Sequence, residues 1–260
     1  MGTSYLLSYF LLHTSNLRIW DLPTGYLSRQ RLLGEHRELH GLQVILAEGR
    51  RGYSRHPETL RWVGALTGLA WRHAQLSAEM ALRGYVDRTP LPLDRSGATW
   101  PDTFITEPAG QIALLREKYG GRESGRIPLP RNAQQLWAQH KYSVMARDPG
   151  AYRRLGRAVA AMRGAAAMAD LARTLVLALR QAPVLGRLVN ALEHMWGHVS
   201  EFAEPEGALA AKRSPAALLS LTQTLAIRHR EAFLLSSTAL SELATYVTSP
   251  SETLEVGSEK

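Results

Sequence analysis

The sequence predicts an all-α protein, and three observations support this prediction. Apolar residues recur every three or four positions over long stretches, as they do on a helix that buries one face. No stretch shows the apolar–polar alternation of a half-buried strand. Proline, glycine and Asp-Pro clusters divide the periodic stretches at places that suit helix ends. The 260 residues suffice for one large domain or two ordinary ones.

Residues that open or close helices justify the first three expected helices. The turn Leu22-Pro23-Thr24-Gly25 precedes the first helix, and Gly49 closes it. Pro57 suits the first turn of the second helix, which runs to about Gly84. The third is a short helix within residues 87–131, whose six prolines otherwise predict loops. In chain order, the expected helices lie at about residues 22–48, 57–84, 109–119, 132–147, 148–181, 184–203 and 215–247.

The same signals separate the later helices. Asp148-Pro149 ends the fourth helix and starts the fifth, which is rich in alanine and stops before Pro183. A loop around residues 205–215 is expected between the last two. Residues 1–16 form an uncharged leader, and residues 248–260 form a polar tail.

Composition excludes several classes of protein. The chain has no cysteine, so it has no disulfide scaffold, iron–sulfur cluster or thiol nucleophile. No apolar run reaches the roughly 18 residues of a membrane span, so no membrane partner is expected. Residues 17–165 hold 23 Lys and Arg against 13 Asp and Glu, whereas residues 166–260 hold 8 against 10. This basic excess predicts a polyanion-binding site in the N-terminal part.

Two histidine pairs have the spacing of helical metal ligands. His36 and His40 lie four residues apart, as do His194 and His198, and this spacing places two imidazoles on one helix face. Neither pair matches the H-E-x-x-H motif, and the sequence indicates no third ligand. We therefore expect ordinary surface or core histidines, and neither a metal nor a cofactor.

Glu38 lies among alternating charges on the first helix. Arg29, Arg31, Glu35 and Arg37 share two turns with it. One interpretation is a solvated helix face with Glu–Arg pairs at helical spacing. The other is a carboxylate set among arginines beside a bound phosphate chain. The residues alone favour the first interpretation.

Several segments resemble the pyrimidine-dimer DNA glycosylases, the phage endonuclease V family. Three of them are N-terminal: Leu17-Arg18-Ile19-Trp20-Asp21, Arg29-Gln30 and Glu35-His36-Arg37-Glu38-Leu39. Glu79 and Arg83-Gly84-Tyr85 resemble the second helix of that family, and residues 148–157 are similar to its aromatic, basic C-terminal segment. The resemblance implies an endonuclease V-like helical domain over residues 17–131, and it continues to about residue 160.

The resemblance also implies a mechanism and its residues. In that family the nucleophile is the α-amine of the chain, and one glutamate on the first helix is essential. These roles carry over to the amine of Leu17 and to Glu38. The DNA-binding residues implied in this way are Arg18, Gln30, Arg31, Arg37, Lys141, Tyr152, Arg153, Arg154 and Arg157.

The leader conflicts with this mechanism, because an amide nitrogen at position 17 cannot form a Schiff base. Either translation starts at position 17, or the protein has lost the lyase reaction. We favour the first, since a leucine codon such as TTG can initiate translation and is then read as methionine. The leader would then not be translated.

A second resemblance overlaps the first and covers residues 132–247. The segments Leu136-Trp137, His140–Arg147 and Asn190–His194 look like the uncharacterised YbgA-type domain. This resemblance implies a helical accessory domain that follows the glycosylase-like domain and whose activity is not known.

These observations predict a DNA repair enzyme with glycosylase and AP-lyase activity, acting through a Schiff base and β-elimination. Its expected partner is double-stranded DNA that contains UV lesions or abasic sites, and its expected location is the cytoplasm, at the nucleoid. Two alternatives remain open. The protein could be a non-catalytic, helical nucleic-acid-binding protein, or the C-terminal domain could act on RNA.

Overall fold

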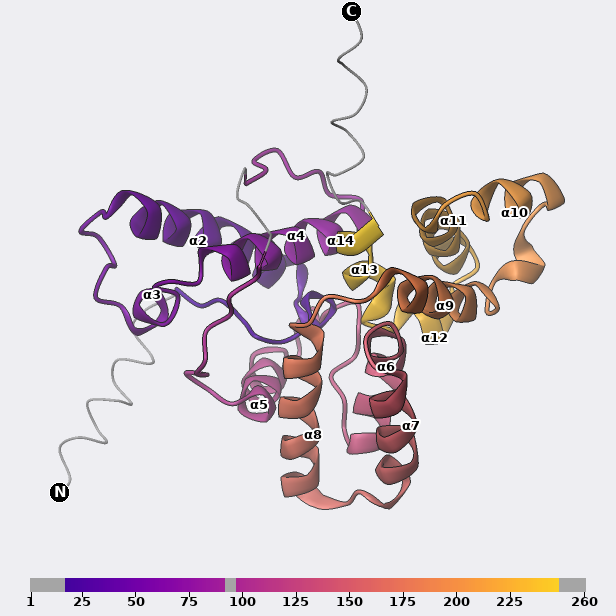
Figure 1. The fold of residues 1–260 in the computed structure, drawn as a ribbon. Coiled ribbons are helices and arrows are strands. Elements are labelled where there is room, and N and C mark those ends of the chain that lie inside the picture. Colours follow the sequence, from indigo (N-terminus) through magenta and orange to yellow (C-terminus); the bar gives the residue numbers. More distant parts are fainter. Residues whose placement is uncertain (1–16, 92–96, 248–260) are drawn as a thin grey trace, which may run out of the picture.

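The computed structural model describes residues 17–91 and 97–247, and every regular element within them is a helix (Figure 1). The predicted all-α class is therefore confirmed. None of the helices in these ranges is long and apolar enough to cross a membrane. The expectations for the leader, residues 1–16, and for the tail, residues 248–260, lie outside the described residues.

The N-terminal part of the chain runs from a short 3-10 helix to an α-helix that follows a long connecting segment. In order, its elements are η1 (Thr24–Tyr26), α2 (Arg29–Glu48), α3 (Pro57–Arg61), α4 (Leu66–Leu82) and α5 (Pro108–Lys118). The elements that follow are α6 (Ala133–Met145), α7 (Pro149–Ala158), η2 (Val159–Ala161), α8 (Gly164–Leu179), α9 (Leu185–Trp196), η3 (Ser200–Phe202), α10 (Pro205–Ala211), α11 (Pro215–Arg228), α12 (Ala232–Leu235), α13 (Ala239–Glu242) and α14 (Ala244–Val247).

Capping side chains explain where several of these helices begin. Ser28 accepts a hydrogen bond from the Arg31 N–H, so α2 begins at Arg29 rather than at residue 22. Asn132 caps α6 in the same way, and Asp148 accepts from two backbone N–H groups at the start of α7. Gly49 ends α2 in the left-handed conformation, as expected.

The predictions of three long helices are wrong, because each of these stretches forms shorter helices separated by a turn. The helix expected at 57–84 is interrupted at Gly64, and the one at 148–181 at Gly164, where both glycines have φ near +80°. The helix expected at 215–247 breaks at Arg230, which has φ +54°. Conversely, the loop expected at 205–215 contains the short helix α10.

Two hydrophobic clusters form the core and share helix α6. The first joins α2, α4, α5 and α8, and it includes Leu136 and Trp137 of α6. The second joins α6 to α9 and α11, through Tyr142 and Met145. The short helices α13 and α14 return to pack on α4, so the C-terminal segment closes on the N-terminal part (Figure 1).

Buried ion pairs fasten these parts together. Arg126 donates to both oxygens of Glu79 on α4 and also to the Leu235 carbonyl. Arg180, at the end of α8, pairs with Asp21 at 2.8 Å. Arg126 thus joins α4 to α12, and Arg180 holds the N-terminal segment from a position 159 residues further along the chain.

Candidate active site

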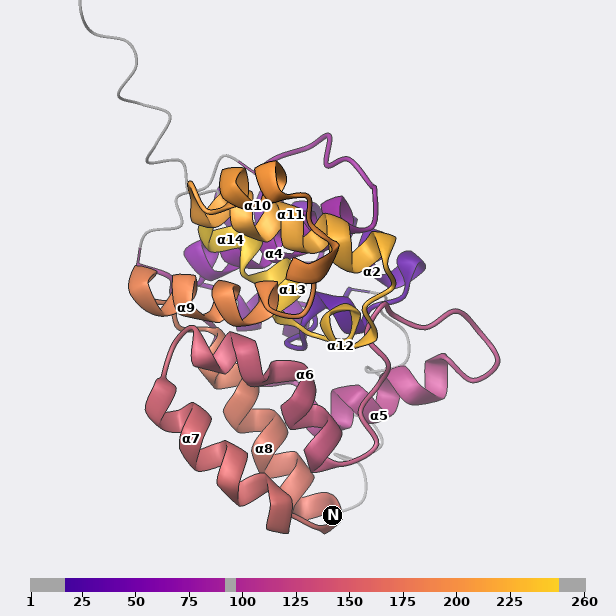
Figure 2. The same ribbon diagram turned by 90° about the vertical axis from the view of Figure 1, so that its right-hand side faces the viewer.

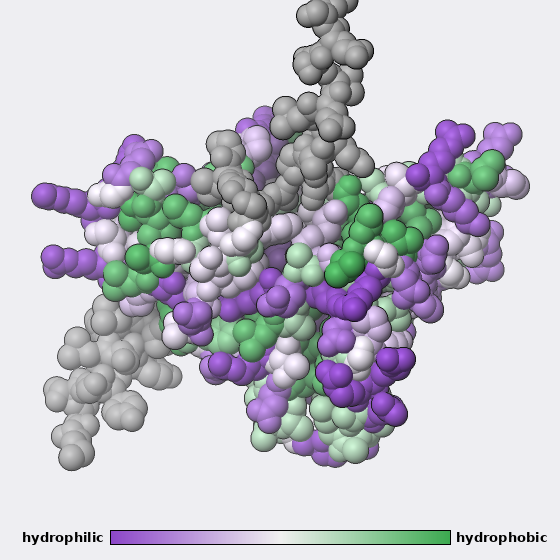
Figure 3. Space-filling view, viewed as in Figure 1, coloured by the Kyte–Doolittle hydropathy of each residue, from purple (hydrophilic) through white to green (hydrophobic). Residues whose placement is uncertain are grey.

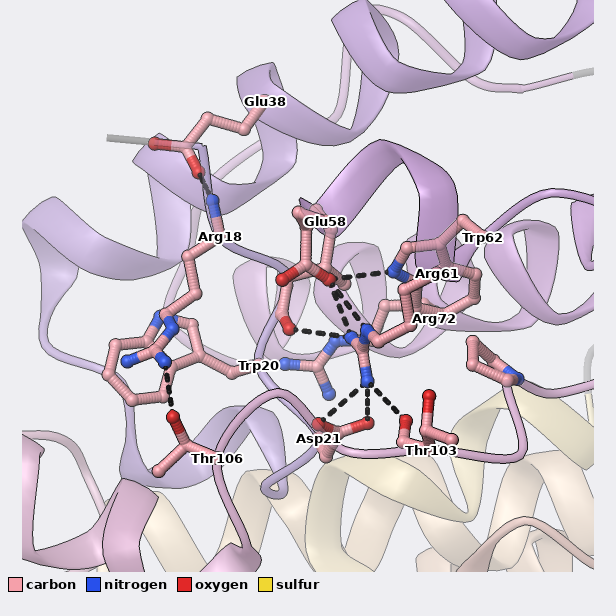
Figure 4. A network of polar contacts seen from close by, with 12 residues as sticks. Arg18, Trp20, Asp21, Glu38, Glu58, Arg61, Trp62, Arg72, Thr103 and Thr106 are labelled. Atoms are coloured by element: carbon pink, nitrogen blue, oxygen red, sulfur yellow. Dashed lines mark hydrogen bonds and ion pairs between the residues drawn. The ribbon is translucent and has the colours of Figure 1, made fainter. Parts of the chain in front are cut away.

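Glu38 meets the N-terminal segment at the start of the described chain. The Arg18 N–H donates a hydrogen bond to Glu38 Oε2 at 2.8 Å (Figure 4). The glutamate is partly buried, and this burial raises the pKa of its carboxyl, while the bond from Arg18 lowers it. Residue 17 therefore directly precedes the residue whose N–H is bonded to Glu38.

The Arg18 side chain is held in place on the other side of the segment. Its guanidinium lies 4.7 Å from the centre of the Trp20 ring, and its Nη2 donates to Thr106 Oγ1 at 2.8 Å (Figure 4). Burial lowers the pKa of this arginine. The positive charge of this side chain therefore lies by Trp20 and Thr106, and Glu38 is contacted by the backbone of Arg18.

A second carboxylate on the same face of α2 anchors the segment from within. Glu35 lies three residues before Glu38, and its Oε1 accepts from the Trp20 N–H at 3.1 Å. Arg72 of α4 pairs with both oxygens of Glu35, at 2.7 and 3.0 Å, and donates to the Leu22 carbonyl. Burial raises the pKa of Glu35 to about 7, against the opposing effect of Arg72.

A network centred on Arg61 continues beneath the segment. Arg61 reaches both oxygens of Asp21, at 2.9 and 3.0 Å, and donates to Glu58 Oε1 at 2.6 Å (Figure 4). Trp62 donates to the same oxygen of Glu58, and Arg180 donates to Asp21. Burial raises the pKa of Glu58. Residues 18–22 are therefore positioned by side chains from α2, α3, α4 and α8.

This geometry has a definite chemical capacity. A partly buried carboxylate can accept and return a proton, and the raised pKa of Glu38 favours its protonated form more than in water. Its negative charge can also stabilise a cation that forms close by. A guanidinium such as that of Arg18 can pair with a phosphate. The start of the segment therefore brings a carboxylate and an arginine together on one short stretch of chain.

The other predicted residues of the first helix lie at or near the surface. Arg31 is partly buried, with its guanidinium 6.0 Å from the Trp20 ring centre, so it lies on the same side as Arg18. Gln30 and Arg37 are exposed, and Arg37 donates only weakly, to the Leu33 carbonyl at 3.3 Å. The structure thus brings Arg31 to Glu38 and Arg18, while the other two face solvent.

The predicted residues of the 141–157 segment lie elsewhere. Arg153, Arg154 and Arg157 are exposed on α7, which lies on the side of the molecule away from α2 in both views (Figures 1 and 2). Hydrophilic side chains gather over the α7 region of the surface (Figure 3). Tyr152 instead packs on Trp137, and Lys141 lies over the Phe233 ring at 4.3 Å.

One of the two histidine pairs has a third partner that the sequence does not reveal. His36 and His40 of α2 meet His73 of α4, with potential ligand atoms all within 4.8 Å of one another. Burial lowers the pKa of His73 to about 4, so this imidazole is neutral at neutral pH. The expectation that the first pair lacks a third ligand was therefore wrong.

Sequence reasoning also missed the arginines that support the site. Glu58 and Arg61 have the i,i+3 spacing of a helical ion pair, and that spacing was a usable signal. Arg72 gives no such signal, because its partner Glu35 lies 37 residues away. Only the packing of α2 on α4 brings these two together.

The fold and the site define a class of protein. It is an all-α protein in which a carboxylate and several arginines gather around the start of the described N-terminal segment. Residues 17–93 match the family model of the pyrimidine dimer DNA glycosylases. Residues 141–213 match a second model, that of a protein family of unknown function (DUF1722).

These two matches confirm both resemblances seen in the sequence, including the YbgA-type C-terminal domain. The first match supports a pyrimidine dimer DNA glycosylase role in general, and it implies DNA as the substrate. Neither curated proteins nor solved structures give a match to this chain.

Proposed function

We propose that the protein excises UV-induced pyrimidine dimers from double-stranded DNA and cleaves the resulting abasic site as an AP lyase. The amine of residue 17 is the nucleophile, in a chain that begins there, and Glu38 is the essential carboxylate. The hydrogen bond from the Arg18 N–H to Glu38 carries the proposal. Consecutive Cα atoms are about 3.8 Å apart, so an amine at residue 17 would lie within reach of Glu38. The family match also begins at residue 17.

The chemistry fits an α-amine. Its pKa of about 7.7–8.0 lies well below the roughly 10.4 of lysine, so far more of it is unprotonated at neutral pH. The amine attacks C1′, and the damaged base leaves with the glycosidic electron pair. The sugar ring then opens to a protonated Schiff base, and loss of a C2′ proton expels the 3′ phosphate. Glu38 stabilises the cations and transfers protons in these steps.

Replacing the proposed carboxylate tests this assignment. For a chain that begins at residue 17, we expect Glu38→Gln to lower cleavage of UV-irradiated duplex DNA by at least about a hundredfold, because general acid–base groups contribute about 10²–10⁴. The amide can still accept the Arg18 N–H, so the fold is retained. Strand cleavage on a denaturing gel measures the effect. Glu48→Gln, at the exposed end of the same helix, is the matched control. Cleavage at the wild-type rate by Glu38→Gln would refute the assignment.

The salt dependence of binding tests whether α7 contacts DNA. Each phosphate contact contributes about −0.9 to the slope of the logarithm of the DNA-binding constant against the logarithm of the salt concentration. We expect replacing the three exposed arginines of α7 with glutamine to make this slope less negative by about 2 to 3 in a fluorescence-anisotropy titration. The replaced residues are Arg153, Arg154 and Arg157.

The control removes the same charge from another surface. Lys212, Arg213 and Arg228 are exposed near α10 and α11, and their triple replacement with glutamine should leave the slope within about one unit of the wild-type value. An equal change in both triple variants would mean that net charge alone acts, and it would remove α7 from the proposed interface.

A further inference from the structure

The three histidines that meet between α2 and α4 form a compact group outside the site described above. Their ring centroids lie 4.8 to 5.0 Å apart in all three pairs. His36 and His40 come from adjacent turns of α2, and His73 comes from the facing turn of α4. The side chains of His36 and His73 are only 9% and 7% exposed.

A carboxylate lies beside two of the three histidines. Asp87, in the loop after α4, places Oδ1 3.2 Å from His36 Nε2 and Oδ2 3.5 Å from His73 Nε2. These separations have a specific meaning for a metal. Ligands at about 2.0–2.2 Å from a tetrahedral zinc ion lie about 3.3 to 3.6 Å from one another.

The two imidazole nitrogens that face Asp87 are unusual for buried polar atoms. Neither His36 Nε2 nor His73 Nε2 has a hydrogen-bond partner, although both are shielded from solvent. Both nitrogens lie within ion-pair distance of Asp87, but neither contact has the geometry of a hydrogen bond. A cation bound to these nitrogens would satisfy them.

The carboxylate itself is held as a metal ligand would be. Ser77 donates to Asp87 Oδ2 at 2.6 Å, and the Thr89 N–H donates to Oδ1 at 2.9 Å. Partners of this kind orient ligands and are part of most metal sites. The remaining histidine, His40, has a hydroxyl neighbour, Thr89 Oγ1, at 3.1 Å from its Nε2.

We propose that His36, His40 and His73 bind one zinc ion, with Asp87 beside it. Imidazole ligands suit Zn²⁺ better than Mg²⁺ or Ca²⁺. Two of the three histidines are buried, so the ion is structural. It ties α2 to α4 and to the loop that carries Asp87. Glu38 lies between the two α2 histidines in sequence and hence on the opposite face of the helix, so the ion holds the helix that carries this carboxylate without touching DNA.

Metal binding by the full chain tests the site directly. Chelator-treated protein is dialysed against ZnCl₂ alone, and bound zinc is measured by atomic emission. We expect one zinc ion per chain, and intense visible bands of tetrahedral cobalt when CoCl₂ replaces zinc. We expect His40→Gln to raise the dissociation constant for zinc at least tenfold. Because His40 is the least buried of the three histidines, this variant should keep its fold, and circular dichroism checks that.

Two further variants sharpen the result. Asp87→Asn should weaken zinc binding as His40→Gln does. His194→Gln alters an exposed histidine of the other i,i+4 pair and should bind zinc like the wild type. Folded wild-type protein that binds no stoichiometric zinc would overturn the proposal. So would unchanged affinity in His40→Gln, equal loss in His194→Gln, or the weak bands of six-coordinate cobalt.

Discussion

A chain that begins at residue 17, with methionine there, is expected to form a covalent adduct with abasic DNA when borohydride is added. The yield of this adduct should be at least about a hundredfold lower when the same chain is extended by one glycine. One extra residue moves the amine by up to about 3.8 Å, and an error of about 1 Å in a reacting group can cost a hundredfold. The position of the amine relative to Glu38 explains this sensitivity.

The adduct is measured as a shifted band of labelled DNA on a denaturing gel. The 260-residue chain, shown by mass spectrometry to be intact, should give only background, since residue 17 then contributes an amide. Duplex binding measured in parallel should remain in both extended proteins. A trapped adduct of equal yield from the intact 260-residue chain would show that another amine, such as a lysine, is the nucleophile.

Removing Arg72 is expected to be the most damaging change to stability. Arg72→Met leaves Glu35 buried with only the Trp20 N–H as a partner, and breaking such a pair costs about 3–5 kcal/mol. Urea unfolding followed by circular dichroism gives the free energy of unfolding. Replacement of the exposed Arg153 by methionine should change it by no more than about 0.5 kcal/mol.

The pH dependence of this deficit identifies the buried charge as its cause. The pKa of Glu35 is raised to about 7 in the folded protein, so its protonated form is favoured there, and this contribution to stability is lost as pH rises through that value. Without Arg72 the pKa rises further. The deficit of Arg72→Met should therefore be smaller at pH 5 than at pH 8.

A second variant separates charge from packing. Changing Glu35→Gln in the Arg72→Met background removes the unpaired charge, and it should recover at least about 1 kcal/mol at pH 8. A deficit that does not depend on pH and is not recovered by Glu35→Gln would assign the loss to packing alone.

Part of the helix pattern was readable from the sequence because local signals decide it. Asn132 and Asp148 cap helices at the expected places because their side chains reach backbone groups two or three residues away. The breaks at Gly64 and Gly164 were missed because a glycine inside a periodic stretch is compatible with either a helix or a left-handed turn. Which of the two forms depends on how the neighbouring helices pack.

The candidate site was also predictable from the sequence only in part. Glu38, Arg18 and position 17 could be chosen from the sequence because their family motif is short and ungapped. Arg72 and Arg180 could not, since they pair with residues 37 and 159 positions away and no spacing rule connects them. The meeting of His73 with His36 and His40 has the same origin.

The amino-acid sequence alone established the helical class, the basic N-terminal part and the motif that begins at residue 17, because these depend on local periodicity, composition and short-range order. Tertiary structure decided which charges are buried together and which face solvent. It brought the Glu38 carboxylate within hydrogen-bonding distance of the Arg18 N–H, whereas α7 lies on another side of the molecule. Burial of an ion pair depends on how helices distant in sequence pack, and that packing is set by the whole core.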